Sequence, residues 1–259
     1  IGSTFYWFIE EGTSNKVITA DMRAKAKIWT EPATVNVEGG ELLDLQTLYN
    51  WHDALYAVGK TSAKLLTSED GFNWQVANED LQFVSILGNQ LKTRDVFGNW
   101  NSDTLNAIIN VEGAYRFAVS ADARQWRIDK DIPSGFPING FTRPISVAAR
   151  TQNGNLSSRL YIMGGKLADG SYTSSTWSCD GWNEDLEGCN WAEFPHGNLP
   201  AMQGGNIIEY TLDSDLPKSF WLLYPGMNID GSIPQKIHYG RNYTTFYYSE
   251  DSGVSWHSL

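Results

Sequence analysis

Aromatic and hydrogen-bonding side chains gather in two long polar connections, where they could hold a ligand. The first connection, 225–245, is roughly twenty residues long, and structureless loops of that length are usually functional or disordered. The second, 129–144, contributes Phe136, Phe141 and Arg143. Aromatic faces beside hydrogen-bond donors suit a sugar or a peptide. We predict that the ligand contacts are His238, Tyr239, Arg241, Tyr243, Phe141 and Arg143. The alternative is that both loops only pack on their neighbours.

Patterns for catalysis or metal binding are weak. The four histidines and two cysteines lack zinc-ligand spacing, and no phosphate-binding glycine loop or serine nucleophile elbow occurs. The Trp-His-Asp tripeptide at 51–53 is better explained as the end of a strand than as a catalytic pair. Asp213 with Asp215, and Asn228 with Asp230, could ligate calcium, but both pairs are typical of polar turns. We expect no catalytic residue and no cofactor, with structural calcium as the open alternative.

A turn signature of Ser-x-Asp followed by Trp recurs along the chain. Its positions are Ser68, Asp70 and Trp74; Ser120, Asp122 and Trp126; Ser178, Asp180 and Trp191; and Ser249, Asp251, Gly253 and Trp256. A fainter copy offers Asp21 and Trp29. Asp at the head of a tight turn can accept hydrogen bonds from the amides two and three residues on. The Trp that follows can bury its indole between strands and fix an outer hairpin, so these residues are predicted to be structural.

Apolar runs between these turns predict the architecture. Upstream of each turn lies a run of five to eight aromatic and β-branched residues, and four of the five repeats have a further run before it. The Trp-to-Trp spacings of 45, 52, 65 and 65 residues are close to one four-stranded propeller blade with loops. We predict one all-β propeller domain over 1–259. Its antiparallel blades are 1–32, 33–79, 80–132, 133–196 and 197–259, with a sixth as the alternative, and the first lacks an innermost strand. Only residues 20–28 have helical composition.

The last of these turns carries a resemblance to a known family. Ser249-Glu-Asp251-Ser-Gly253-Val-Ser-Trp256 resembles the Asp box (BNR repeat) of sialidase-like propellers. The segment 161–177, with Gly164-Gly165 and Trp177, is similar to kelch blades. The combination resembles uncharacterised surface or periplasmic propellers of the Bacteroidetes, which implies a cell-surface or periplasmic protein but brings no established activity.

The resemblance also implies where a ligand would bind. Asp boxes of sialidases lie on the face away from the active site, so we expect a glycan or protein ligand on the face opposite these turns. The arginine triad and the Phe/Tyr-Arg-Ile/Leu-Pro motif of sialidases are missing, and Phe141-Thr-Arg143-Pro144 is the nearest approach. We therefore expect a non-catalytic binding or scaffold module. Two alternatives stay open: a sialidase-like hydrolase acting on glycans, and a kelch-type adaptor inside cells.

Composition excludes other classes of protein. The formal charge of −11 and a pI near 4.8 argue against nucleic acid, whose phosphates require clustered Lys and Arg. No apolar run approaches the roughly 18 residues that span a bilayer, so we expect no transmembrane segment. We expect a monomer.

Cys179 and Cys189 bracket an insert in the third of the four complete turns, and the two ends of that insert should meet across a hairpin. A disulfide there, which would place the protein in an oxidising compartment, contributes about 2–3 kcal/mol by loop closure. We predict that alkylation of the unfolded, non-reduced chain leaves its mass unchanged, whereas prior reduction adds two alkyl groups. Labelling of both cysteines without reduction would contradict the pairing and favour the intracellular adaptor.

Overall fold

A computed structural model of the chain shows an almost entirely β structure. It describes residues 3–25, 28–91, 103–142, 145–150, 156–180, 190–194, 199, 201–210, 220–228, 235–238, 241–244, 247–250 and 255–258. The only helical element in these ranges is the 3-10 turn η1 (Glu38–Gly40). The chain divides into two compact units, each described by itself. The first comprises 1–86 and 107–130, and the second comprises 87–106 and 131–259.

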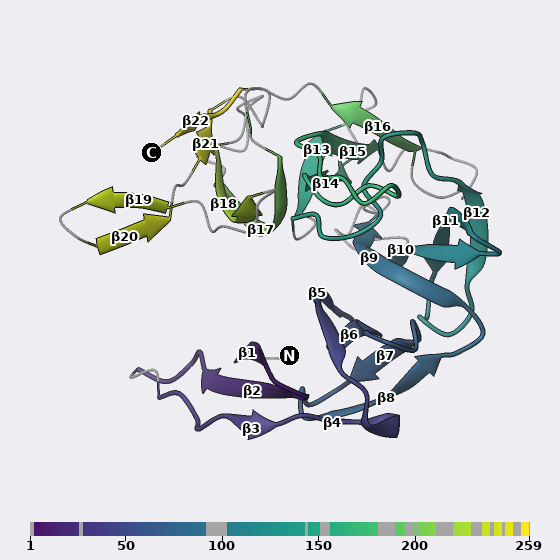
Figure 1. Cartoon of the computed structure of the whole chain (residues 1–259), viewed down its shortest axis with the longest axis vertical. Coiled ribbons are helices and arrows are strands. Elements are labelled where there is room, and N and C mark those ends of the chain that lie inside the picture. The colour runs from purple at the N-terminus through teal and green to yellow at the C-terminus, as the bar shows by residue number, and fades with distance from the viewer. Residues whose placement is uncertain are drawn as a thin grey trace. The chain divides into compact units, whose positions relative to one another are not determined.

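The first unit contains two sheets (Figure 1). One has the order β1-β2-β3, and its strands are β1 (Thr4–Glu11), β2 (Ser14–Asp21) and β3 (Ala33–Thr34). The other has the order β4-β8-β7-β6-β5. Its strands are β4 (Asn36–Val37), β5 (Leu43–Trp51), β6 (Ala54–Gly59), β7 (Leu65–Ser68) and β8 (Asn73–Asn78). Strands β5 to β8 pair antiparallel in chain order, whereas β4 pairs parallel to β8.

Three further sheets repeat the four-strand pattern. The residues of the sheet β12-β11-β10-β9 are divided between the two units; its strands are β9 (Gln82–Leu91), β10 (Asp103–Val111), β11 (Ala114–Ser120) and β12 (Arg127–Asp131). The next sheet contains β13 (Ile145–Arg150), β14 (Leu156–Met163), β15 (Thr176–Asp180) and β16 (Asn190–Phe194). The last contains β17 (Met202–Tyr210), β18 (Phe220–Asn228), β21 (Tyr247–Ser249) and β22 (His257–Ser258). These four-stranded antiparallel sheets confirm the predicted blade architecture.

The segment 20–28, with its helical composition, does not form a helix in its described part. Ala20 and Asp21 end β2, and residues 22–25 form a turn and bend. Trp29 is 46% exposed and bridges Ala20, so it is not the buried indole that the faint fifth copy predicted. Asp21 accepts a hydrogen bond from the Arg23 amide, and Thr19 stands where the four complete copies have serine.

The connection from 229 to 246 also differs from the prediction of a structureless loop. It contains a separate two-stranded hairpin of β19 (Gln235–His238) and β20 (Arg241–Thr244). Strands of four residues are too short to give a recognisable alternating pattern in the sequence, which is why the hairpin was missed.

The core of the first unit lies between its two sheets. It consists of Val17, Val35, Leu43, Leu55, Ala57, Leu66 and Trp74, with Tyr6 and Phe8 packed against it. The Phe8 and Trp74 rings meet edge to face with centroids 6.0 Å apart, a favourable aromatic geometry. Gly71 has a φ of +77°, and a Cβ there would lie 2.5 Å from the Tyr6 ring, so only glycine allows this approach.

The turn that positions Trp74 is held by one carboxylate. Oδ1 of Asp70 accepts hydrogen bonds from the amides of Phe72 and Asn73, both at 2.8 Å, and Ser68 Oγ accepts from the Gly71 amide at 2.8 Å. The indole N–H of Trp74 donates to the Gly71 carbonyl at 3.2 Å. Partial burial opposes ionisation of Asp70, but the hydrogen bonds from Asn73, Phe72 and Ser68 outweigh it and lower its pKa to about 2.

A second turn repeats this arrangement. Oδ1 of Asp122 accepts from the amides of Arg124 and Gln125 at 2.9 and 2.8 Å, and the Trp126 indole donates to the Ala123 carbonyl at 3.0 Å. Hydrogen bonds from the Gln125 and Arg124 amides lower the pKa of Asp122. Both Ser-Asp-Trp turns, 68–74 and 120–126, therefore satisfy their own carboxylates.

We predict that Asp70→Ala lowers the free energy of unfolding at pH 7 by about 1 kcal/mol, or about 2–4 °C in Tm, since the exposed carboxylate is screened by solvent. Because the pKa of Asp70 is lowered on folding, its contribution is present above about pH 4 and is lost as the pH falls towards 2. Thermal melts of wild type and variant should therefore converge with acid. The matched control is Glu69→Ala, the adjacent exposed acid, and an equal loss of stability there would contradict this account.

Candidate functional site

Strand direction places several polar connections at one end of the first unit's sheets. Because these strands are antiparallel, the start of β5, the β6–β7 connection and the end of β8 lie at the same end of the sheet. The 68–74 turn between β7 and β8 lies at the opposite end. Glu41, Ser62 and Glu79 therefore lie at the end opposite the Ser-Asp-Trp turn. This is the end where the sequence predicts ligand binding.

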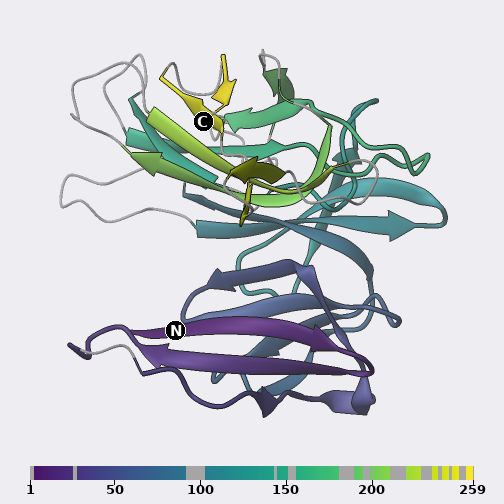
Figure 2. The ribbon, with the colours of Figure 1, turned by 60° about the vertical axis from the view of Figure 1, so that its left-hand side comes forward.

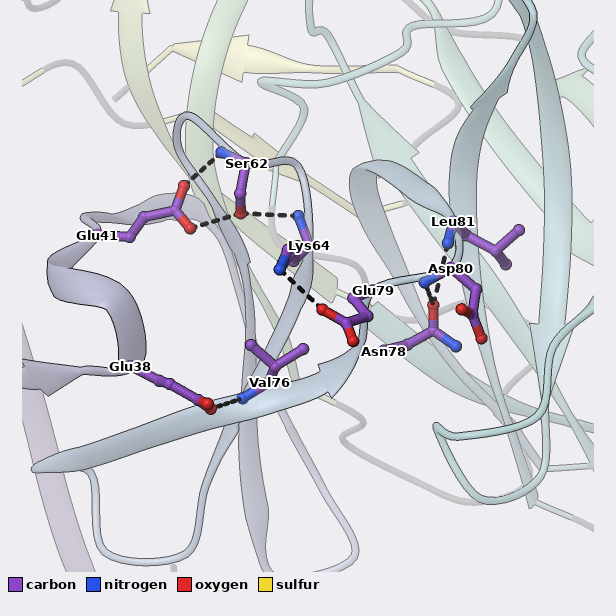
Figure 3. A network of polar contacts seen from close by, with 9 residues as sticks. All are labelled: Glu38, Glu41, Ser62, Lys64, Val76, Asn78, Glu79, Asp80 and Leu81. Carbon is purple, nitrogen blue, oxygen red and sulfur yellow. Dashed lines mark hydrogen bonds and ion pairs between the residues drawn. The ribbon is translucent and has the colours of Figure 1, made fainter.

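A pocket of about 690 Å³ lies beside β8 at this end (Figure 3). It is lined by Glu38, Gly39, Glu41, Ser62, Lys64, Val76, Ala77, Asn78, Glu79, Asp80 and Arg124. Four acidic side chains and two cationic ones give it a polar, net negative lining. Figure 3 shows that its acids come from η1, from the segment between η1 and β5 and from the connection after β8.

Glu41 is the most firmly held acid of the pocket. Its Oε1 accepts hydrogen bonds from the Thr61 and Ser62 amides at 2.7 and 2.5 Å, and its Oε2 accepts from Ser62 Oγ at 2.5 Å. Partial burial raises the pKa of Glu41, but the bonds from Ser62 and Thr61 outweigh it, and the net pKa is lowered. Glu41 therefore stays ionised at neutral pH and fixes the β6–β7 connection.

The pocket wall beside β8 is held by a chain of polar contacts. Lys64 Nζ lies 2.9 Å from Glu79 Oε2, and this hydrogen-bonded ion pair lowers the pKa of Glu79 and raises that of Lys64. The Val76 amide donates to Glu38 Oε2 at 3.0 Å. Asn78 Oδ1 accepts from the amides of Asp80 and Leu81 at 3.1 and 3.2 Å. These contacts fix the positions of the acidic groups before any ligand arrives.

Arg124 brings the second Ser-Asp-Trp turn to the pocket. Asn78 Nδ2 donates to the Arg124 carbonyl at 3.0 Å, which links the end of β8 to the turn 120–126. The pocket thus has one wall from the turn that was expected to be purely structural. It lies beside an outermost strand rather than at the innermost strands.

A second polar group lies at the start of the innermost strand β5. The β5–β6 register shifts between Asp44 and Tyr49, a bulge in which Asp44 Oδ1 accepts from the Gln46 amide at 3.0 Å. Burial raises the pKa of Asp44; Lys60 and the Gln46 amide partly counter this, and Glu10 adds to it. Lys60 Nζ lies 2.5 Å from Glu10 Oε1, and both groups act electrostatically on Asp44, so the three form one charged group near the start of β5.

The predicted ligand contacts are placed only in part. His238 and Arg241 are Cα partners in the β19–β20 hairpin, and Tyr243 lies on β20, but their side chains are outside the described set. Tyr239 and Arg143 lie outside the described residues. Phe141 is 6% exposed, so its ring packs inside the second unit.

The remaining turn residues lie at the predicted strand ends. Ser178, Trp191, Ser249 and Trp256 are buried, and Trp256 packs with Tyr161, Met163, Leu199 and Met202. Asp180 ends β15, whereas Asp251 and Gly253 lie outside the described residues. Cys179 is buried and disulfide-bonded. Cys189 lies outside the described residues, so its pairing stays a prediction.

The weaker patterns are resolved as turns where they are described. His52 and Asp53 both have positive φ, 48° and 57°, as the two central residues of a type I′ turn require, and they join β5 to β6. Asp213, Asp215 and Asp230 are outside the described residues. Within the ranges that the structure describes, no group of three or more His, Cys, Asp or Glu could hold a metal ion, and no helix is long and apolar enough to span a membrane.

The chain is a β-propeller domain, which is the class that both its four-stranded antiparallel sheets and its family match indicate. The family model of the DUF6242 beta propeller domain matches residues 1–259, and the chain belongs to that family. No curated protein matches it. Among solved structures, a sucrose-bound mutant of the Bombyx mori GH32 beta-fructofuranosidase is similar at 11% identity and a TM-score of 0.44. The match covers 99% of this chain and 60% of that enzyme, so the chain spans less than two thirds of its length.

We predict that Asp44→Asn raises Tm at pH 7 by roughly 1–3 °C, because it removes a charge whose ionisation burial disfavours. A carboxyl whose pKa is raised by folding destabilises the fold above its folded pKa and has no such effect below its ordinary pKa. The gain should therefore vanish at about pH 3. Thermal melts over this pH range test it, with the exposed Glu31→Gln as control. A lower Tm at pH 7 would show that Asp44 contributes as a carboxylate.

Proposed function

We propose that this propeller is a non-catalytic binding or scaffold module that contacts a glycan or protein through the end of its blades opposite the Asp-box turns. The pocket beside β8 is the observation that carries the proposal. Its charged groups converge there from connections that are distant in the sequence, and they are already held in place by hydrogen bonds. A preorganised polar wall loses little entropy when a hydroxyl-rich or charged ligand binds.

The ionisation of Glu41 and Glu79 argues against a role for either as a general acid. The pKa values of Glu41 and Glu79 are both lowered, so neither carries a proton near pH 7 to give to a leaving group. Their oxygens act as hydrogen-bond acceptors, and Lys64 and Arg124 offer donors to the same space. Acceptors beside donors suit sugar hydroxyls and the polar side chains of a protein.

The predicted loop residues belong to the same functional end of their own sheet. Tyr239 and Arg241 occupy the connection between β18 and β21, which corresponds topologically to the β6–β7 connection that carries Ser62. An extracytoplasmic location, in the periplasm or at the cell surface, is supported by the disulfide at Cys179, because disulfides persist in oxidising compartments.

A glycan-active hydrolase is the second candidate, and one observation favours it. Asp44 on the bulged strand β5 has a raised pKa, to which Glu10 of β1 contributes, and two carboxyl groups with different pKa values are the kind of pair that glycoside hydrolysis uses. Lys60 pairs with Glu10 at 2.5 Å and leaves that carboxylate engaged, which is why binding is the first proposal.

We predict that a glycan array probed with the labelled chain gives signals that Asp80→Ala in the pocket weakens at least tenfold; a signal that Arg241→Ala weakens instead would assign the binding to the loop. Glu69→Ala, an exposed acid in the opposite-end turn, is the matched control and should retain full signal. Loss of signal in Glu69→Ala alone would contradict ligand binding at the end opposite the Asp-box turns. An array without any signal would contradict a glycan ligand and favour a protein ligand. Cleavage of a bound glycan, detected by mass and abolished by Asp44→Asn, would favour the hydrolase.

A further inference from the structure

Two hollows follow one another along the outer strand β8. The pocket beside β8 is lined on this side by residues 76–80. A smaller hollow of about 290 Å³ is lined by three residues of the same strand, Asn73, Trp74 and Gln75, together with Asn36, Val37 and Glu38. Because Glu38 lines both, the two hollows form one β8 groove that runs from the first residue of the strand to the connection after it (Figures 1 and 2).

The length of the β8 groove indicates an elongated ligand. Residues 73–80 line it, and an extended chain of that length spans roughly 25 Å. Strand β4 pairs with Asn73 and Trp74 and ends there. Glu38 and Asp80, farther along the groove, are exposed, so no described part of the chain covers these two carboxylates. A compact sugar would fill one hollow, whereas an extended peptide segment can follow both.

The β8 groove carries more negative than positive charge. Its described lining contains four carboxylates and two cations, namely Glu38, Glu41, Glu79 and Asp80 against Lys64 and Arg124. The Lys64 ammonium already pairs with Glu79 at 2.9 Å, and Arg124 interacts electrostatically with Asp122 of its own turn. The groove therefore attracts a cationic ligand and repels an anionic one such as an acidic glycan.

Two carboxylates keep acceptor capacity for such a ligand. Within the described residues, Asp80 takes part in one hydrogen bond, through its amide, so both of its carboxylate oxygens remain available. Glu38 accepts from the Val76 amide with Oε2 and keeps Oε1. In Figure 3 the Lys64–Glu79 ion pair lies between these two acids. A ligand with two separated cations can therefore engage Glu38 and Asp80, whereas a single central cation would meet the Lys64 ammonium.

The chemistry of the lining favours a peptide over a sugar. A sugar is best held by an exposed aromatic face beside hydrogen-bonding groups. The described lining has one aromatic residue, Trp74, whose side chain is 3% exposed and whose indole N–H donates to its own turn. Val76 and Ala77 instead offer apolar surface to the stem of a long basic side chain, whose charged end can reach a carboxylate. Arginine can also bind a carboxylate through two parallel hydrogen bonds.

We propose that the β8 groove binds an extended basic segment of a protein partner, which places one Arg or Lys side chain on Glu38 and another on Asp80. The residues between the two cations are neutral, because they lie opposite Lys64. This inference rests on the proposed function, and it narrows the ligand of the pocket from a glycan or protein to a basic protein segment.

The probe is a fluorescein-labelled peptide, GRGSGRG, whose two arginines lie on the same face of an extended chain. Fluorescence anisotropy at about 50 mM salt should show saturable binding to the 259-residue chain. Asp80→Asn and Glu38→Gln should each weaken binding about fivefold, since each removes one charge-assisted contact, and glutamine can still accept from the Val76 amide. Citrulline in place of both arginines keeps the shape of the peptide and removes its charge, so the citrulline peptide should show no saturable binding.

The matched control is Glu69→Gln, which removes one exposed negative charge outside the groove. An equal loss of affinity in Glu69→Gln would show that the peptide responds to the net charge of −11 and not to the groove, which would overturn the proposal. Unchanged affinity in Asp80→Asn and Glu38→Gln, equal binding by the citrulline peptide, or no saturable binding by the arginine peptide would overturn it too.

The glycan array separates this inference from the proposed function. A glycan signal that Asp80→Ala removes, without any binding of the arginine peptide, would refute the basic segment and leave the pocket as a binding site. An array signal and a peptide affinity that are both unchanged in Asp80→Ala would refute ligand binding at the pocket itself, on which both proposals rest.

Carboxyl labelling tests whether the groove is open in the free chain. A carbodiimide with glycine ethyl ester, followed by peptide mass spectrometry, should modify Glu38 and Asp80 in the free chain, and the arginine peptide should protect both. Protection of the two carboxylates in the free monomer would show that another part of the chain already covers the groove, and would refute the proposal. Protection that appears only as the chain dimerises would assign the groove to a second copy, with the same consequence.

Discussion

A carboxylate that accepts hydrogen bonds from the amides of its own turn is the interaction on which the rest of the described structure depends. In the turns 68–74 and 120–126 this bond fixes the direction in which the chain reverses, and the reversal sets the indole of Trp74 or Trp126 against the neighbouring strands. Because β7 and β8, and likewise β11 and β12, are joined by such a turn, the register of each of these two outer hairpins follows from it. With the outer hairpin fixed, the connections at the other end are free to vary in length and polarity.

That division of roles explains the contrast between the two ends of the sheets. The carboxylates of Asp70 and Asp122 are satisfied internally and have little left to offer a partner. At the other end Glu41 and Glu79 are also held, but they line an open pocket together with Asp80 and Arg124. The two ends are not fully separate, because Asn78 after the pocket wall of β8 donates to the Arg124 carbonyl of the turn 120–126, and Arg124 lines the pocket.

The sequence allowed the strands to be predicted well, since each is an apolar run whose burial is local information. Strand β6 coincides with ALYAVG, the apolar run upstream of the turn 68–74. Strands β10, β14 and β18 overlap the apolar runs upstream of the other three turns. The pocket could not be predicted, because its acids lie in two stretches of the sequence, Glu38 with Glu41 and Glu79 with Asp80. Nothing in the sequence shows that the sheet brings the two stretches together. Trp29 matches the other indoles in spacing, yet its side chain is 46% exposed, and burial is not visible in the spacing.

The parallel pairing of β4 with β8 ties the first two sheets into one mechanical element. The Asn36 amide donates to the Phe72 carbonyl at 2.7 Å, and the Asn36 and Asn73 side chains meet at 3.2 Å, so the linker leaving the first sheet is fastened to the outer margin of the second. A force that pulls on the N-terminal strands would therefore have to shear β4 along β8 and break the hydrogen bonds between them. Local opening of the first sheet alone would require these β4–β8 contacts to break first. We therefore expect the two sheets to unfold as one cooperative unit.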